Sequence, residues 1–235
     1  MRYQAIATDY DETLACNGRV RGAAIEALMR ARDSGRALVL VTGRELPELR
    51  GVFARLDLFD LVVAENGTLL YSPATHKEEP LGPPAPVELV NALEQREVRP
   101  LSVGRCVVAT VRANETAVLE TIRDLRLKMQ AVYNRDSVMI LPDGHDKGSG
   151  LRTALRRLKI ASENVAAIGD AENDLPLLEV AGLRVAVGNA TPGLKEKAAV
   201  ITEGECGAGV VEMIDQILAD GAGMPGEIIE RAREF

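Results

Sequence analysis

Three aspartates in this sequence follow short apolar runs, where they could hold a metal ion and act on a phosphate group. Asp9 and Asp11 lie two residues apart near the start of the chain, and Asp170 follows a second apolar run far downstream. Carboxylates that meet at one site repel each other, and a hard divalent cation with oxygen ligands relieves the repulsion. No His or Cys accompanies these acids, so the set favours Mg²⁺ over Zn²⁺. One carboxylate could also be a nucleophile that forms an aspartyl-phosphate intermediate.

A second set of residues could bind phosphate oxygens. Thr42 and Gly43 follow another apolar run and offer a hydroxyl and a backbone N–H. Arg44 comes next. It could act at the site or lie on the surface of a first helical turn, and the sequence leaves both roles open. Lys147 would supply a point charge that screens the Asp9 carboxylate and stabilises the transition state.

The elements that must position these residues are predicted to be a parallel sheet and its helices. Apolar runs rich in Val, Ile, Leu and Ala do not alternate with polar residues, which is typical of strands buried on both faces. Amphipathic segments separate them, so the order favours an α/β fold, a Rossmann-like parallel sheet with helices on both faces. Ligands collect at the carboxyl ends of such strands. The predicted strands are 3–8, 37–41, 61–64, 165–168, 184–187 and 199–202, and the predicted helices are 21–33, 47–56, 150–159 and 173–180.

The middle of the chain has a different pattern, which predicts an inserted α/β domain. A Pro-rich entry at 80–86 and a Pro-Asp-Gly exit at 142–144 are typical of domain hinges. Between them the predicted order is helix, two strands, helix, two strands. Residues 83–145 carry eight acidic and eight basic residues, so the net charge of −7 lies outside them. The predicted division is a core of residues 1–82 and 147–235 and a cap of residues 83–146. In the cap, the predicted helices are 87–97 and 115–128, and the predicted strands are 101–103, 105–111, 131–134 and 137–141.

Composition excludes several classes of protein. The 235 residues are 46% hydrophobic and 27% charged, which is enough apolar material for a sizeable core. A net charge of −7 with 3% aromatic residues and no Trp argues against nucleic-acid binding. The sequence contains no run of about 18 apolar residues, so it predicts no membrane span. Residues 1–8 do not resemble a signal peptide. Three distant cysteines without a C-x-x-C pair predict no disulfide framework and fit a reduced, cytoplasmic compartment.

Four of these segments, in this order, resemble the motifs of the haloacid dehalogenase superfamily of phosphatases. Asp9-x-Asp11-x-Thr13 is similar to the first motif, Thr42-Gly43 to the second, Lys147 to the third and Gly169-Asp170-x-x-x-Asp174 to the fourth. The turns at 65–67, 146–148 and 188–190 resemble the Cof-type branch, also called subclass IIB, which has an α/β cap between the second and third motifs. The resemblance covers residues 3 to 215. In length and cap size the chain is most similar to the archaeal-type phosphoglycolate phosphatases.

The resemblance implies a role for each matched residue. Asp9 would be the nucleophile, and Asp11 the general acid and base that protonates the leaving alcohol and then activates water. Mg²⁺ would be held by an Asp9 oxygen, the Asp11 backbone carbonyl and Asp170, with Asp174 as a ligand or a support for the ligands. Asn173 would add a phosphate contact. The implied partner is a small phosphorylated metabolite, either phosphoglycolate or a sugar phosphate, and the choice between a monomer and a homodimer is open.

Two departures and two alternatives accompany this prediction. Position 12 is Glu where the family usually has Gly, and position 10 is Tyr where Leu or Ile is common. Glu12 is expected to point away from the metal. A phosphomutase of the phosphomannomutase type shares both aspartates, although the short cap argues against it. A non-catalytic module that binds a phosphorylated metabolite, part of a longer protein, is the alternative outside catalysis. A short terminal helix is expected after Gly221.

Overall fold

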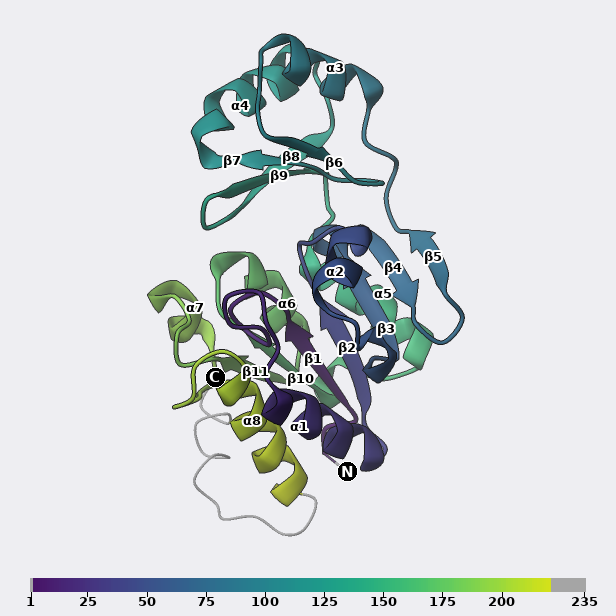
Figure 1. The fold of residues 1–235 in the computed structure, drawn as a ribbon, viewed down its shortest axis with the longest axis vertical. Helices are drawn as coiled ribbons and strands as arrows, with labels where there is room; N and C mark the ends of the chain where they lie inside the picture. Colours follow the sequence, from purple (N-terminus) through teal and green to yellow (C-terminus); the bar gives the residue numbers. More distant parts are fainter. Residues whose placement is uncertain (1, 221–235) are drawn as a thin grey trace.

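The computed structural model describes residues 2–220 and, within that range, contains two β-sheets that lie at opposite ends of the long axis (Figure 1). The large sheet has eight strands in the order β12-β11-β10-β1-β2-β3-β4-β5. The six from β12 to β3 are parallel, and β4 and β5 continue the sheet antiparallel. Its strands are β1 (Ala5–Asp9), β2 (Ala37–Val41), β3 (Leu61–Ala64), β4 (Leu69–Ser72), β5 (Lys77–Pro80), β10 (Val165–Gly169), β11 (Leu183–Ala186) and β12 (Val200–Ile201).

Helices cover both faces of the large sheet, which confirms the predicted α/β class. Helices α1 and α8 pack against each other on one face, and α5 and α6 pack against each other on the other (Figure 1). The helices that belong to this sheet are α1 (Gly22–Asp33), α2 (Leu46–Val52), α5 (Lys147–Leu158), α6 (Leu175–Val180), α7 (Pro192–Lys197) and α8 (Gly207–Asp220). Short 3₁₀ turns are η1 (Leu56–Leu58), η2 (Glu65–Gly67), η4 (Ser162–Asn164) and η5 (Glu172–Asp174).

The six predicted strands all form, with ends displaced by two residues at most. Every residue of β1 is buried, as are all of β3 and β10, because helices cover both of their faces. The carboxyl ends of β1, β2 and β3 point toward the second sheet (Figure 1). The polar residues that follow these strands therefore meet at one edge of the large sheet.

The antiparallel hairpin of β4 and β5 was not predicted from the sequence. Its outer strand reads Lys-Glu-Glu-Pro, and such charged residues are depleted in strands. At the edge of a sheet, however, charges and Pro discourage pairing with another chain. The hairpin extends the parallel sheet by pairing β4 with β3.

The small sheet comprises four antiparallel strands in the order β6-β7-β9-β8, within residues 83–146. Two helices cover the face that is turned away from the large sheet (Figure 1), and Leu89, Leu93 and Val118 of these helices pack on Val108 and Ile140. The predicted order of elements is confirmed. The bounds are α3 (Val87–Gln95), β6 (Leu101–Val103), β7 (Val108–Val111), the 3₁₀ turn η3 (Arg112–Asn114), α4 (Glu115–Asp124), β8 (Met129–Asn134) and β9 (Ser137–Pro142).

Two predicted elements of this region are shorter than expected. The predicted strand 105–111 begins at Val108, because the N–H of Gly104 bonds to the carbonyl of Val107 and closes a turn there. The predicted helix 115–128 ends at Asp124, just before Arg126 adopts a φ of 52°. Among residues 2–220, no helix is both long enough and apolar enough to cross a bilayer. The helix expected after Gly221 lies outside the described residues.

Candidate active site

Lys147 lies at the start of α5, which the sequence predicted to begin three residues later. Asp146 caps this helix, because its side chain accepts a hydrogen bond from the Ser149 N–H at 2.6 Å while the Ser149 hydroxyl accepts one from the Asp146 N–H. The backbone of Asp146 packs closely against Gly67, whose φ is 103°. A Cβ added at Gly67 would collide with the Asp146 carbonyl oxygen, so this position has no room for a side chain. These contacts fix the point from which the Lys147 side chain enters the protein.

The buried ammonium of Lys147 joins two of the predicted aspartates. Its Nζ lies 2.7 Å from Oδ1 of Asp9 and 2.6 Å from Oδ1 of Asp174, and the lysine is 1% exposed. Burial lowers the pKa of Lys147, but Asp174 and Asp9 outweigh it and raise the pKa above its ordinary value. Lys147 therefore stays charged and holds the Asp9 carboxylate in one orientation.

Asp174 organises the loop that carries Asp170. Its Oδ1 accepts from Lys147, and its Oδ2 accepts from the backbone N–H groups of Asp170 and Ala171 at 3.0 and 3.2 Å. Both oxygens of this buried carboxylate are therefore engaged by the protein. The geometry fits a residue that positions Asp170 rather than one whose oxygens are free for a ligand.

Asp9, Asp170 and Asp174 form a compact acidic cluster. Each offers a carboxylate oxygen, and these oxygens lie within 4.8 Å of one another. Burial and the charges of Asp174 and Asp170 raise the pKa of Asp9 well above its usual range, although Lys147 lowers it. Burial and Asp174 also raise the pKa of Asp170. The cluster has more negative charge than its lysine balances, so its donor set fits a hard divalent cation.

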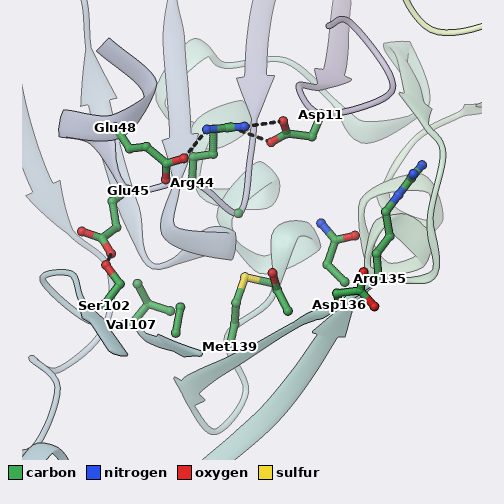
Figure 2. Close-up of a pocket in the computed structure, with 13 residues that line it drawn as sticks. Asp11, Arg44, Glu45, Glu48, Ser102, Val107, Arg135, Asp136 and Met139 are labelled. Atoms are coloured by element: carbon green, nitrogen blue, oxygen red, sulfur yellow. Dashed lines mark hydrogen bonds and ion pairs between the residues drawn. The ribbon is translucent and has the colours of Figure 1, made fainter. Parts of the chain in front are cut away.

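Asp11 lies beside this cluster, at the wall of a cavity, and is paired with Arg44. The Arg44 guanidinium donates to both Asp11 oxygens, with Nε and Nη2 at 2.8 and 2.7 Å, and its Nη1 pairs with Glu48. Figure 2 shows the guanidinium between these two carboxylates, across the cavity from Met139. The hydroxyl oxygen of Thr42 accepts a hydrogen bond from the backbone N–H of Arg44 at 3.1 Å. Arg44 is thus a cavity residue rather than a surface residue of the first helical turn.

Among residues 2–220, two buried side-chain amides have no hydrogen-bond partner. Neither side-chain atom of Asn173 or of Asn66 is paired, although the residues are 6% and 1% exposed. A Cβ built on Gly43 would lie 4.0 Å from Oδ1 of Asn66, so this amide faces the Thr42-Gly43 turn. Buried polar groups are nearly always paired, so these amides suit a polar ligand that the protein itself does not supply. From the sequence, Asn66 was identified only as part of the turn at 65–67.

The cavity lies between the two sheets and has a volume of about 380 Å³. The large sheet contributes Asp11, Gly43 and Arg44, while Val107 and Met139 come from the region of the small sheet (Figure 2). Pockets of this size accommodate small metabolites. A ligand in the cavity would contact residues from both sheets.

Arg135 brings a cation from the small sheet to the acidic cluster. It lies in the turn between β8 and β9, and its Nη2 is 2.7 Å from Oδ2 of Asp170, whose Oδ1 accepts from the Thr13 hydroxyl. Arg112 stacks on Tyr133 and Arg105 pairs with Glu78, but Arg135 lines the cavity.

The backbone conformation at Glu12 shows why a glycine is usual at this position. Its φ is 56°, in the left-handed region that Gly adopts without strain. Its Oε1 accepts from the Asn17 N–H at 3.0 Å, and its other oxygen lies near Cys206, in a cluster separate from Asp9. Tyr10 is buried against Phe53. Neither departure removes a polar atom from the acidic cluster.

Glu65 connects the large sheet to the turn between β6 and β7, a contact that the sequence did not reveal. This glutamate follows β3 and is 1% exposed, and its two oxygens accept from the N–H groups of Arg105 and Cys106 at 3.0 and 2.9 Å. A Cβ on Gly104 would lie 2.8 Å from the same carboxylate, which requires the small residue there. Glu65 therefore holds the Val107 side of the cavity wall against the large sheet.

Replacing Glu65 by Ala is expected to lower the free energy of unfolding by about 2–4 kcal/mol, because two backbone N–H groups lose their acceptor. The melting temperature should fall by about 5–10 °C, and KM should rise more than kcat falls. Thermal unfolding and steady-state kinetics measure both effects. Glu65→Gln keeps one acceptor oxygen, so its melting temperature should lie between those of wild type and Glu65→Ala. Equal melting temperatures for wild type and Glu65→Ala would show that this contact does not anchor the turn.

The comparisons with known proteins agree with this geometry. The model of the haloacid dehalogenase-like hydrolase family matches residues 6–104 and 100–214. A phosphoglycolate phosphatase of Pyrobaculum aerophilum is 32% identical over 232 residues, which cover 96% of this chain and 100% of the relative. A haloacid dehalogenase-like hydrolase of Bacteroides thetaiotaomicron has the same fold, with a TM-score of 0.74, 22% identity, and coverage of 92% of this chain and 99% of that one. A subclass IIB sugar phosphatase superposes with a TM-score of 0.68 and 20% identity, covering 85% of this chain and 93% of that one.

The chain belongs to the haloacid dehalogenase-like hydrolases. Within that family its relatives include proteins named phosphatases, and it shares its fold with a subclass IIB sugar phosphatase. The family and the enzyme class predicted from the sequence are confirmed.

Proposed function

We propose that this enzyme is a Mg²⁺-dependent phosphatase that hydrolyses a small phosphomonoester through an aspartyl-phosphate on Asp9. The observation that carries the proposal is the buried Lys147, which bridges Asp9 and Asp174 at the carboxyl ends of the parallel strands. A lysine in this place orients a carboxylate and leaves a positive charge beside it. That arrangement suits a nucleophile whose target is itself anionic.

Mg²⁺ would be held by Asp9, Asp170 and the backbone carbonyl of Asp11. Asp174, predicted as a ligand or a support, acts in this proposal as a support because both of its oxygens are already engaged. When bound, the cation supplies the positive charge that the cluster lacks and neutralises the charge of a phosphate group. Arg135 would then exchange its contact with Asp170 for one with the substrate.

In the first step a carboxylate oxygen of Asp9 attacks phosphorus, so an O–P bond forms as the bond to the leaving alcohol breaks. Asp11 donates its proton to the departing oxygen. In the second step Asp11 takes a proton from a water molecule that attacks the same phosphorus atom. The bond between phosphorus and Asp9 breaks, and inorganic phosphate leaves. In the structure Arg44 holds both Asp11 oxygens, so one of these contacts must open before Asp11 can give or take the proton.

The phosphate oxygens would be bound by Thr42, Gly43, Lys147 and Asn173. The unpaired amide of Asn173 supports its part, and the unpaired amide of Asn66 adds a donor that the sequence did not assign. Each group lies in or beside the strand-end loops that surround Asp9. The phosphate would thus be held by a hydroxyl, backbone N–H groups, amides and one ammonium.

The proposed substrate is phosphoglycolate, with sugar phosphates as the competing class. The cavity of about 380 Å³ suits a small metabolite, and Arg44 and Arg135 line it as cations that can pair with a carboxylate. The phosphoglycolate phosphatase named above also supports this choice. Residues 83–146 would form the cap that selects the substrate and closes the cavity, on a core of residues 1–82 and 147–235.

The proposed location is the cytoplasm. The chain has only three cysteines, with no C-x-x-C pair, which supports a reducing compartment. The proposed partner is the small phosphorylated metabolite alone, acted on by a monomer or a homodimer.

Phosphate release from a substrate panel tests this proposal. With Mg²⁺, the purified chain should hydrolyse phosphoglycolate with a kcat/KM about tenfold above that for glucose 6-phosphate, and should also release nitrophenol from p-nitrophenyl phosphate. EDTA should reduce all three rates to background, and added Mg²⁺ should restore them. Turnover that EDTA leaves unchanged contradicts the metal assignment. Isomerisation of a sugar phosphate without phosphate release would indicate a mutase, and binding without any turnover would indicate a binding module.

A further inference from the structure

Two of the three cysteines meet in the fold although 190 positions separate them. Cys16 Sγ lies 2.7 Å from Cys206 Sγ, and Oε2 of Glu12 lies 3.8 Å from Cys206 Sγ. Cys206 is buried and Cys16 is partly exposed. The spacing of the cysteines predicted no disulfide framework. The pairing was hidden because Cys16 follows β1 and Cys206 directly precedes α8.

The separation of the two sulfurs is closer to that of a covalent bond than to that of a metal site. A disulfide has an S–S distance of about 2.0 Å. Two thiolates on one tetrahedral zinc ion would lie about 3.8 Å apart, given Zn–S distances of about 2.3 Å. At 2.7 Å the sulfurs need to approach further to form a bond and would need to separate to hold a metal ion. We propose that Cys16 and Cys206 are a disulfide-forming pair that a peroxide oxidises.

The surroundings give the two cysteines different roles in the reaction. A cavity of about 190 Å³ is lined by both cysteines, and Cys16 is the more exposed of the two, so a peroxide reaches its sulfur first. Burial, Cys16 and Glu12 raise the pKa of Cys206 to about 12. Cys16 therefore reacts first and Cys206 second.

The chemistry balances with peroxide as the oxidant. The Cys16 thiolate attacks one peroxide oxygen, which yields a sulfenic acid and hydroxide as the O–O bond breaks. The sulfur of Cys206 then attacks the sulfur of that sulfenic acid. The S–O bond breaks, and the thiol proton leaves with the hydroxyl group as water. Two thiols are oxidised to one disulfide, and one peroxide is reduced.

The cross-link would reinforce a connection that hydrogen bonds already make. The side chain of Asn189 donates to the carbonyl of Glu12 at 2.8 Å and accepts from the Cys206 N–H at 2.7 Å. The loop so held is the one that carries Asp11 and Thr13. Because the sulfurs already lie 2.7 Å apart, bond formation shortens their separation by only about 0.7 Å. Oxidation should therefore stabilise the protein and preserve its hydrolytic activity.

The test is oxidation of the full chain by hydrogen peroxide, followed by titration of free thiols in denaturant. The titrated thiols should fall from three to one, and peptide mapping should find Cys16 linked to Cys206 within one chain. The melting temperature should rise by about 5–10 °C and return after reduction by dithiothreitol. None of these three readouts depends on phosphatase activity, so the result is independent of the proposed function.

Cys106→Ser is the matched control, because Cys106 lies at the Gly82 carbonyl, away from the pair. It should keep the rise in melting temperature, whereas Cys16→Ser and Cys206→Ser should each lose it. Three thiols remaining after oxidation would overturn the proposal. So would a sulfinic or sulfonic acid at Cys16 beside a free Cys206, or a cross-link between two chains.

Discussion

Replacing Asp9 by Asn is expected to abolish hydrolysis of p-nitrophenyl phosphate while leaving the fold intact. The amide has nearly the same shape as the carboxylate but is a poor nucleophile, so the rate should fall by roughly 10³-fold or more. The fold should survive, because burial and two neighbouring acids already raise the pKa of Asp9 and a neutral side chain removes part of that repulsion. The variant should melt at or above the wild-type temperature.

Initial rates at saturating Mg²⁺ and thermal unfolding of the same preparations measure these two effects. Glu12→Gln is the matched control, because it also changes one acid of the same loop into its amide but lies in a different cluster. This control should keep most of the activity. An Asp9→Asn variant with more than a tenth of the wild-type rate would show that Asp9 is not the nucleophile.

Replacing Lys147 by Met is expected to cause the largest loss of stability. The change leaves Asp9 and Asp174 buried without their shared counter-charge, and breaking a buried ion pair in this way costs about 3–5 kcal/mol. The melting temperature should fall by about 6–15 °C, and hydrolysis should fall with it. Lys77→Met removes the charge of an exposed lysine and should change the melting temperature little.

The stability of Lys147→Met should also depend on pH in a defined direction. The pKa of Asp9 is already raised in the folded state, and loss of the lysine removes an interaction that lowers it. A group with a raised folded-state pKa binds more protons when folded, so its stabilising contribution is present at low pH and is lost as the pH rises through that pKa. The deficit relative to wild type should therefore be smaller at pH 5 than at pH 8. A deficit that grows as the pH falls would contradict this assignment of charges.

The sequence predicted the parts of this structure that rest on local pattern. Runs of buried aliphatic residues gave six parallel strands, and the polar residues after them were rightly expected at one edge of the sheet. The bridge from Lys147 to Asp9 followed from that placement. The charged strand β5 was not predicted, because Lys, Glu and Pro are uncommon in strands. Its place at the edge of the sheet depends on tertiary packing, which the local sequence does not show.

Contacts that depend on the approach of distant segments could not be predicted. Glu65 was one residue of a turn until the structure placed the N–H groups of Arg105 and Cys106 against it. Arg135 differed in no local feature from Arg112, and only the β8–β9 turn brings it to Asp170. The proximity of Cys16 and Cys206 likewise depends on how α8 packs beside the loop after β1.

The central claim is that phosphate passes through Asp9, and the most direct test uses Asp11→Asn with p-nitrophenyl phosphate. Nitrophenolate leaves without a proton, so Asp9 should still be phosphorylated, but without Asp11 the attacking water is not activated. We predict a burst of one nitrophenolate per site and a phosphoryl group on the peptide that contains Asp9, found by mass spectrometry after acid quench. Phosphate on another residue, or steady turnover with no burst and no covalent phosphate, would contradict the account.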